Sequence, residues 1–377
     1  MDFALDEDLE MFRKNIRKYL DKEGQTDVAR AFIKGNTELV DQTIVGLAEL
    51  GTTAVNISEE NEGIGLGTVA LVPIFEELGR VLLPGPLLET LAFAVPLLEK
   101  YGTREQKEKY LPEIASGSRT VTLAWLEPGS DYGPLDVQCE GKQTGDKLII
   151  NGTKEMVPEA DTVDTLLTVV RTSQSDRKEG ISLVLIDKDD VTSIEQQLSF
   201  DETKHLGKVT FNDVKVSKED VLGGVNQGWE VLEEGLLHLN AAISSSMTGG
   251  IEKIVETISE YANIREQFGG PIGRFQAVKH PIVNIKVDLE SARSLSYYAA
   301  WALENDAEDK LSAIYSARAF ATEAFIKAAS DNIQLHGGIG FTEEIDCHLF
   351  LKRARFYENY VGSEVDFNEH IATALGW

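Results

Sequence analysis

The stretch GWEVLEEGLLHLNAAISSSMTGGIEKIVETISEYANI, residues 228–264, keeps a helical hydrophobic period over its whole length. Three further long helical patterns follow it, at about 273–305, 309–336 and 343–360, and a short tail helix comes last. Turns marked by glycine or proline separate these segments. Long helices joined by short turns predict an up-and-down helical bundle for this part of the chain.

Upstream of the bundle the hydrophobic period changes twice. From Thr120 to about Phe211 the segments are short, rich in Val, Ile, Leu and Thr, and bounded by turn residues, which predicts a mostly antiparallel β domain. These expected strands are Lys147–Asn151, Thr165–Arg171, Ile181–Ile186 and Lys208–Phe211. Before Ser118 the pattern is helical again, with amphipathic segments at about 6–24, 37–50, 68–83, 87–100 and 103–116.

The predicted class is therefore an α+β multidomain protein. We expect a helical N-terminal domain at 1–118, a β middle domain at 119–223 and a C-terminal helical bundle at 224–377. Long helical windows between the strands are missing, which disfavours a doubly wound parallel sheet.

Charge and composition exclude several classes of partner. The 377 residues carry 36 Lys+Arg against 63 Asp+Glu, a formal net charge of -27, which argues against nucleic acid or anionic lipid as the main partner. No apolar run is long enough for a spanning helix, so membrane insertion is not expected. The two cysteines, Cys139 and Cys347, are far apart, which favours a reducing cytoplasm. The six histidines include no pair spaced for one helix face, so no metal site is expected.

Two stretches carry residues suited to phosphate binding. In REQFGGPIGRF, residues 265–275, one helix stops and the next starts, and a cation, an amide and an aromatic ring at such a break can grip a phosphate and stack on a base. In QLHGGIGFT, residues 334–342, glycines allow a phosphate to approach the backbone. The structural alternatives are a helix–turn–helix in which Phe268 and Phe275 are core residues, and a glycine-rich turn between helices.

Together, these two stretches resemble the signature segments of the acyl-CoA dehydrogenase family. Shorter matches extend the resemblance over most of the chain: EELGR (76–80), YGTREQK (101–107), EPGSD (127–131), NGTK (151–154), FNDVKV (211–216) and LG (222–223). Family members have a helical N-domain, a β middle domain and a C-terminal four-helix bundle, in agreement with the order predicted from periodicity. The resemblance implies FAD as cofactor, an acyl-CoA thioester as substrate, and an electron-transfer flavoprotein or similar acceptor as a partner.

The family reaction needs a carboxylate that removes the α-proton of the thioester while the β-hydride passes to N5 of FAD. In many members this Glu stands in a Tyr-Glu-Gly sequence after the second signature, and the matching stretch here, RARFYENYVGS at 353–363, has Val361 in its place. A minority of members carry the base in the helix before the first signature, where this chain has Leu239 and Asn240. We therefore assign no catalytic residue in this chain.

The flavin-contacting segments of the β domain also differ from the family pattern. Leu126 stands where members have Thr, the segment after it is shortened, and Met156-Val157-Pro158 replaces the usual Trp-Ile-Ser/Thr. Residues that a family subunit lends to its neighbour's FAD, around the adenosine diphosphate, are retained. The candidate cofactor-binding residues are Arg265, Gln267, Phe268, Phe275, Gln334, Gly337 and Gly338.

This asymmetry resembles the small subunits of heteromeric acyl-CoA dehydrogenases, as do FQAVKH (275–280), YYAAW (297–301) and LFLKRA (349–354). Such complexes handle bulky acyl-CoAs such as steroid side-chain, alicyclic or dicarboxylic thioesters. The leading hypothesis is a base-deficient subunit of an α2β2 acyl-CoA dehydrogenase with a homologous catalytic subunit as partner. Two alternatives stay open. One is a self-sufficient homotetrameric flavoenzyme, with Glu358, Glu364 or Asp366 as a displaced base or with a β-elimination that needs none, and the other is a scaffold subunit without flavin.

Overall fold

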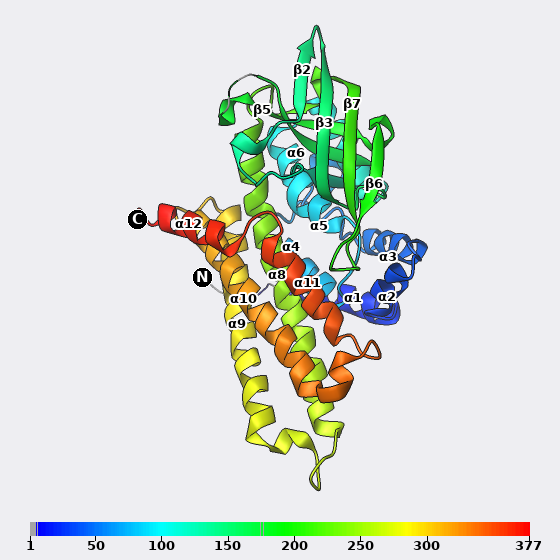
Figure 1. Ribbon diagram of the computed structural model, residues 1–377, viewed down its shortest axis with the longest axis vertical. Coiled ribbons are helices and arrows are strands. Elements are labelled where there is room, and N and C mark those ends of the chain that lie inside the picture. Colours follow the sequence, from blue (N-terminus) through cyan, green and yellow to red (C-terminus); the bar gives the residue numbers. More distant parts are fainter. Residues whose placement is uncertain (1–4, 6, 174, 176) are drawn as a thin grey trace. The chain divides into compact units, whose positions relative to one another are not determined.

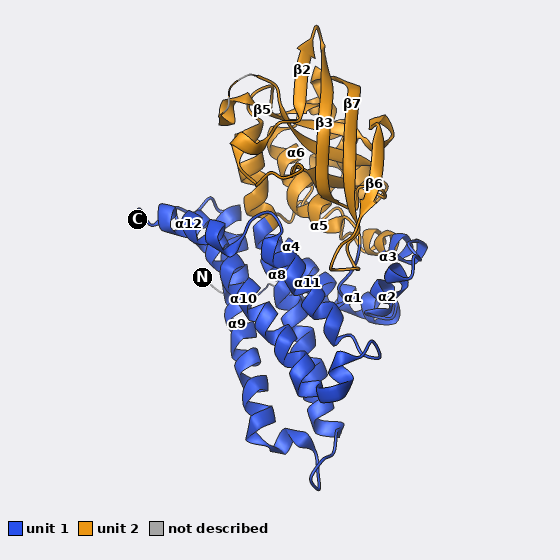
Figure 2. Cartoon of the chain, in the orientation of Figure 1, with its two compact units in different colours: residues 1–43, 68–84, 240–377 blue, residues 44–67, 85–239 orange. Residues whose placement is uncertain are grey.

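The computed structural model describes residues 5, 7–173, 175 and 177–377. Along the chain, helices come first, strands follow, and long helices return (Figure 1), which confirms the predicted α+β class. The chain forms two compact units (Figure 2). Unit 1 comprises residues 1–43, 68–84 and 240–377, and unit 2 comprises residues 44–67 and 85–239.

Unit 1 is helical and contains the bundle. Its helices are α1 (Glu7–Lys22), α2 (Asp27–Ile33), the first part of α3 (Glu38–Glu49), α4 (Leu71–Arg80), most of α8 (Gly228–Ile264), α9 (Gln276–Glu304), α10 (Lys310–His336), α11 (Cys347–Asn359) and α12 (Glu364–Ala374). Helix α10 packs against α9, α11 and α12. Helices α4 and α8 cross through glycines, because a Cβ on Gly79 would lie 1.9 Å from the main-chain oxygen of Ser246, and one on Gly249 would lie 1.8 Å from that of Glu76.

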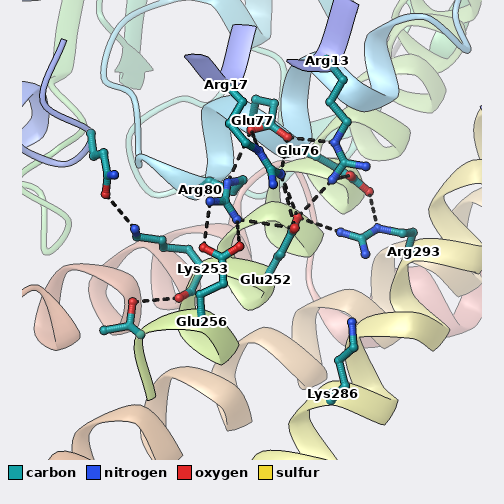
Figure 3. A network of polar contacts seen from close by, with 12 residues as sticks. Arg13, Arg17, Glu76, Glu77, Arg80, Glu252, Lys253, Glu256, Lys286 and Arg293 are labelled. Carbon is teal, nitrogen blue, oxygen red and sulfur yellow. Dashed lines mark hydrogen bonds and ion pairs between the residues drawn. The ribbon is translucent and has the colours of Figure 1, made fainter. Parts of the chain in front are cut away.

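A cluster of charged side chains ties α1, α4, α8 and α9 together (Figure 3). It contains the four arginines Arg13, Arg17, Arg80 and Arg293 and the four glutamates Glu76, Glu77, Glu252 and Glu256. The contacts are short: Nη2 of Arg17 lies 2.6 Å from Oε1 of Glu77, and Nη2 of Arg293 lies 2.8 Å from Oε2 of Glu252. Charged groups that are largely buried need partners of opposite charge, because the pairing offsets the cost of removing them from water. The EELGR segment therefore has a structural role in this unit.

Unit 2 is built on an eight-stranded sheet with short helices. The strands are β1 (Val121–Ala124), β2 (Glu140–Thr144), β3 (Lys147–Pro158), β4 (Thr165–Arg171), β5 (Ile181–Asp187), β6 (Ser193–Gln197), β7 (Leu206–Ser217) and β8 (Val221–Leu222). The helices wholly in this unit are α5 (Leu87–Glu89), a π-helical turn (Thr90–Ala94), α6 (Val95–Tyr101) and α7 (Arg104–Ala115). The sheet order is β6-β7-β3-β2-β4-β5-β8, with β1 paired to β4. Pairing is antiparallel except for β1 with β4 and β2 with β4, so the prediction of a mostly antiparallel domain is confirmed.

The long β3–β7 ribbon carries the segment that the family pattern places at the flavin. Its pairing register shifts between Ile150 and Gly152 and again between Lys154 and Val157. At the second shift the fully buried ammonium of Lys154 lies 2.6 Å from Oε1 of Glu127. This buried ion pair joins β3 to the EPGSD segment, so Lys154 and Glu127 both have a structural role. In the part of the chain that the structure describes, none of the helices is both long and apolar enough to cross a membrane.

Candidate functional site

The two signature stretches meet at one end of the bundle. Helix α8 ends at Ile264 and α10 ends at His336. The ring of Tyr261, in the last turn of α8, contacts the ring of His336 in a tilted arrangement, with 4.4 Å between centroids and 34° between the ring planes. The Tyr261 hydroxyl also donates a hydrogen bond of 3.2 Å to the main-chain oxygen of His336. These contacts bring together the segments that contain the predicted cofactor-binding residues.

The first signature ends in a tight turn that presents Phe268 to solvent. The amide of Gln267 donates to the main-chain oxygen of Gly270 at 3.0 Å, and φ is 51° at Phe268 and 86° at Gly269. Two positive φ angles mark a hairpin turn of the primed type, in which a bulky residue costs on the order of 1 kcal/mol. Phe268 is 87% exposed, so the alternative in which it is a core residue is wrong. A strained backbone that exposes a phenyl ring is typical of a binding segment.

Arg274 holds this turn in place, a role that the sequence reasoning missed. Its guanidinium donates to the main-chain oxygens of Phe268 and Gly269, the latter at 3.3 Å. It also lies 4.8 Å from the ring centroid of Phe275, which meets Phe268 edge-on. Arg265, by contrast, has an exposed side chain with no hydrogen bond or ion pair to any described residue. Arg265 is therefore the cation of this segment that is available to an anionic ligand.

The second signature forms an open glycine turn. Gly337 has φ 64° and ψ −138°, a conformation that suits glycine alone. Gly338 has an ordinary φ, and a Cβ built on it would meet nothing within 4 Å, so the described chain gives no steric reason for glycine there. Gln334 and both glycines are exposed. The main chain of this turn is thus accessible, so that a diphosphate or the backbone of a partner could approach it closely.

Neither position at which the family carries its base has a carboxylate. Val361 is buried, and its φ of 57° is rare for a β-branched residue. Leu239 and Asn240 are also buried. The backbone at Val361 is therefore held in an unusual conformation although its side chain cannot take a proton.

Arg318, which the sequence reasoning did not single out, is the group that links these two positions. Its Nε donates to Oδ1 of Asn240 at 3.0 Å, and Nη2 donates to the main-chain oxygens of Tyr357 and Tyr360, at the end of α11. Nη1 donates to Oγ1 of Thr322 at 2.6 Å. Arg318 is fully buried, and burial lowers the pKa of this guanidinium to about 9. The negative end of the α11 dipole offsets part of the cost of burying the charge.

The carboxylates near Val361 are engaged elsewhere or exposed. Glu358 forms an ion pair with Nη1 of Arg355 at 2.9 Å, one turn back on the same helix. Asp366 accepts hydrogen bonds from the amide and the hydroxyl of Ser363 and so caps α12. Glu364 is an exposed residue in the first turn of α12. The geometry in this unit gives no support to a displaced base.

The flavin-edge segment of unit 2 does not fit the family's way of holding an isoalloxazine. The amide of Met156 donates to Oε1 of Gln197 at 2.7 Å, and Pro158 has no amide proton. The main-chain oxygen of Leu126 accepts a hydrogen bond from Glu155 at 2.8 Å. The donors that would bind a flavin edge are thus used or missing. The residues of unit 1 that are expected at a diphosphate are exposed, whereas the segment of unit 2 that is expected at the isoalloxazine has its Met156 amide engaged and a proline at 158.

Family models match the chain in three consecutive segments. The acyl-CoA dehydrogenase N-terminal domain matches residues 6–118, the middle domain matches 123–214, and the C-terminal domain matches 226–375. Together these matches leave only short gaps between Asp6 and Leu375.

Curated relatives and solved structures agree with these matches. The 3-(aryl)acrylate reductase of Clostridium sporogenes is 27% identical over 371 residues, with 94% of each chain covered. The glutaryl-CoA dehydrogenase of Desulfococcus multivorans is 28% identical over 373 residues, covering 96% of this chain and 95% of that one. The structure of butyryl-CoA dehydrogenase from Megasphaera elsdenii superposes with a TM-score of 0.93 over 100% of both chains, at 23% identity, which shows a shared fold.

Proposed function

The chain belongs to the acyl-CoA dehydrogenase family, and from this premise we propose that it is the base-deficient subunit of a heteromeric, FAD-dependent enzyme. Enzymes of this family are oxidoreductases that act on CH–CH bonds, here the α,β bond of an acyl-CoA thioester. In this proposal the homologous partner subunit carries the base and the isoalloxazine site. The present chain lends the residues that hold the adenosine diphosphate of the partner's FAD.

One observation carries the proposal: the two halves of the cofactor site differ within this chain. Arg265, Gln267 and Phe268 are exposed and have the chemistry of a diphosphate and adenine site, while Val361 and Pro158 lack the groups that the reaction and the flavin edge need. A self-sufficient enzyme needs both halves, and a scaffold subunit needs neither. Retention of one half fits a chain that completes a neighbour's site.

Each retained residue has a definite part in this half-site. The Arg265 guanidinium would pair with the diphosphate, since its planar fork matches phosphate oxygens. The Gln267 amide would add a hydrogen bond, and the Phe268 ring offers a face to the adenine. When bound, FAD accepts the β-hydride of the acyl thioester. The 63 acidic residues of the chain make a local cation such as Arg265 necessary for an anionic cofactor.

Further parts of the proposal rest on the resemblance. We propose an electron-transfer flavoprotein or similar protein as the electron acceptor, and a bulky acyl-CoA as the substrate. The unpaired thiols of Cys139 and Cys347, both buried, suit a reducing cytoplasm.

The test is the Arg265→Ala variant, co-purified with the homologous subunit encoded beside it. Loss of a charge-assisted contact to phosphate is expected to weaken FAD retention by about tenfold or more. FAD per complex is measured by absorbance after gel filtration. Arg104→Ala, which removes an exposed arginine of unit 2, is the matched control and keeps its FAD. If Arg265→Ala retains as much FAD as the wild type, the half-site assignment is wrong.

A further inference from the structure

Unit 1 contains a cavity of about 510 Å³ that the proposed dehydrogenase function does not use. Its walls come from α2 and the turn before it, the C-terminal part of α8, the end of α10, the segment that follows α10, and the start of α11. Tyr261 and His336, whose rings contact each other, line it, so the cavity lies beside the backbone that leads into Gly337. It is open to solvent on one side and large enough for a small organic group.

A buried polar atom in the cavity wall has no partner. Asn332 lines the cavity and is 2% exposed, and its Oδ1 accepts no hydrogen bond from any described residue. A buried amide oxygen without a hydrogen bond is destabilising, so Oδ1 of Asn332 is an acceptor that a donor from a ligand can satisfy. Nδ1 of the neighbouring His336 does not supply this donor, because it lies 2.8 Å from the main-chain oxygen of Asn332. The site therefore calls for a ligand with an N–H or O–H group.

The charges around the cavity favour a cation. Four of the charged lining residues are acidic, namely Asp27, Glu260, Glu344 and Asp346, and two are basic, namely Arg30 and Lys253. Arg30 is bound to Asp346 at 2.5 Å, and the ammonium of Lys253 donates to the neutral amide of Gln25 at 2.7 Å. Asp27, Glu260 and Glu344 are exposed and form no ion pair with any described residue. The rim thus keeps an excess of negative charge.

We propose that this cavity binds a guanidinium or primary ammonium group. Oδ1 of Asn332 accepts its hydrogen bond, the Tyr261 ring offers a π face, and the carboxylate of Glu260 supplies charge at the mouth. Such a group can come from a free amine or from an arginine or lysine side chain of a partner subunit. The inference does not depend on the role proposed for the FAD half-site.

The experiment uses the full chain and two probes of matched shape. Butylguanidinium carries the cation and the N–H donors, and butylurea has the same shape without the charge. Titration followed by NMR is expected to show saturable binding of butylguanidinium, about tenfold tighter than butylurea, and weaker at higher salt. Absence of saturation, or equal affinity for the two probes, would overturn the proposal.

Variants locate the binding in the cavity. Asn332→Leu is expected to weaken binding about tenfold, and Glu260→Gln, which changes only an exposed side chain, about threefold. Glu323→Gln removes an equally exposed carboxylate of unit 1 away from the cavity and is expected to leave the affinity unchanged. If Glu260→Gln and Glu323→Gln change the affinity for butylguanidinium equally, the binding site is not in this cavity. Repeating the titration on the co-purified assembly distinguishes the sources, because a partner side chain in the cavity would block the probe and a free amine site would stay open.

Discussion

At the scale of single residues, the buried Arg318 binds the backbone close to Val361, the position where a catalytic base is expected. The Arg318 guanidinium binds the carbonyls of Tyr357 and Tyr360 at the end of α11, four residues and one residue before Val361, and it also binds Asn240. One buried cation thus holds residues that adjoin the two expected base positions, Leu239 and Val361, in the sequence.

At this scale we expect Arg318→Met to destabilise the chain by about 3 kcal/mol. The change leaves the carbonyl oxygens of Tyr357 and Tyr360 and the amide oxygen of Asn240 without their buried donor. Urea denaturation followed by tryptophan fluorescence measures the free energy of unfolding. Arg318→Lys keeps the charge but not the fork of donors, so we expect a smaller loss. A loss below about 1 kcal/mol for Arg318→Met would show that the network is not needed.

Among the elements, the turn between α8 and α9 is held by main-chain hydrogen bonds and by one side chain, that of Arg274. Arg274→Ala removes the donor that holds the carbonyls of Phe268 and Gly269. Because the turn is exposed, we expect the free energy of unfolding to change by less than about 0.5 kcal/mol, while amide exchange at 267–270 becomes faster. Hydrogen exchange with mass spectrometry measures this. Unchanged exchange in the turn would contradict the role given to Arg274.

The charge cluster at α1, α4, α8 and α9 makes the acid stability of unit 1 depend on Glu252. Burial alone would raise the pKa of Glu252, but the guanidinium groups of Arg293, Arg80, Arg17 and Arg13 outweigh it and hold the pKa below its usual value of 4.5. A carboxyl with a lowered pKa in the folded state contributes stability above its unfolded pKa, and that stability is lost as the pH falls through the folded pKa.

We therefore expect Glu252→Gln to lower the free energy of unfolding by about 3 kcal/mol at pH 7, because the cluster then has more arginines than carboxylates. The difference from the wild type should shrink as the pH falls below 4.5. Thermal unfolding from pH 7 to pH 3 checks this. Glu256, which is more exposed, serves as the comparison through Glu256→Gln and should show a smaller difference. If the difference in stability between the wild type and Glu252→Gln stays constant down to pH 3, the ionisation of Glu252 does not control the acid stability of unit 1.

The long helices could be predicted from the sequence because their signal is local. The pattern at 228–264 coincides with α8, and those at 309–336 and 343–360 differ from α10 and α11 by a few residues at most. Strands β1, β2, β6 and β8 and helix α2 were not predicted. β1 is short, and its place depends on parallel pairing with the distant β4. β2 has the sequence EGKQT, which is mostly exposed and has no apolar alternation.

At the scale of the whole molecule, some residues of the candidate site could also be predicted from the sequence and others could not. Arg265, Gln267, Phe268, Gln334, Gly337 and Gly338 could be found because they stand in recognisable motifs. The contacts of Arg318 with Asn240, 78 positions away, and the unsatisfied oxygen of Asn332 arise only from tertiary packing. No local pattern marks such residues, since their neighbours in space are distant in sequence.

The net charge of -27 affects how the whole chain interacts with an anionic cofactor. A chain with this charge repels an anionic dinucleotide except where a cation is exposed, and Arg265 is such a cation at an open turn. In the proposed assembly, Arg265 would supply this cation to a cofactor that the chain holds jointly with its partner.

The most direct test is the FAD content of the full chain purified alone, set against that of the assembly with its homologous subunit. We expect the isolated chain to contain no stoichiometric FAD and to show no acyl-CoA dehydrogenase activity, and the assembly to contain one FAD for each pair of chains. Stoichiometric FAD together with dehydrogenase activity in the isolated chain would contradict the central claim.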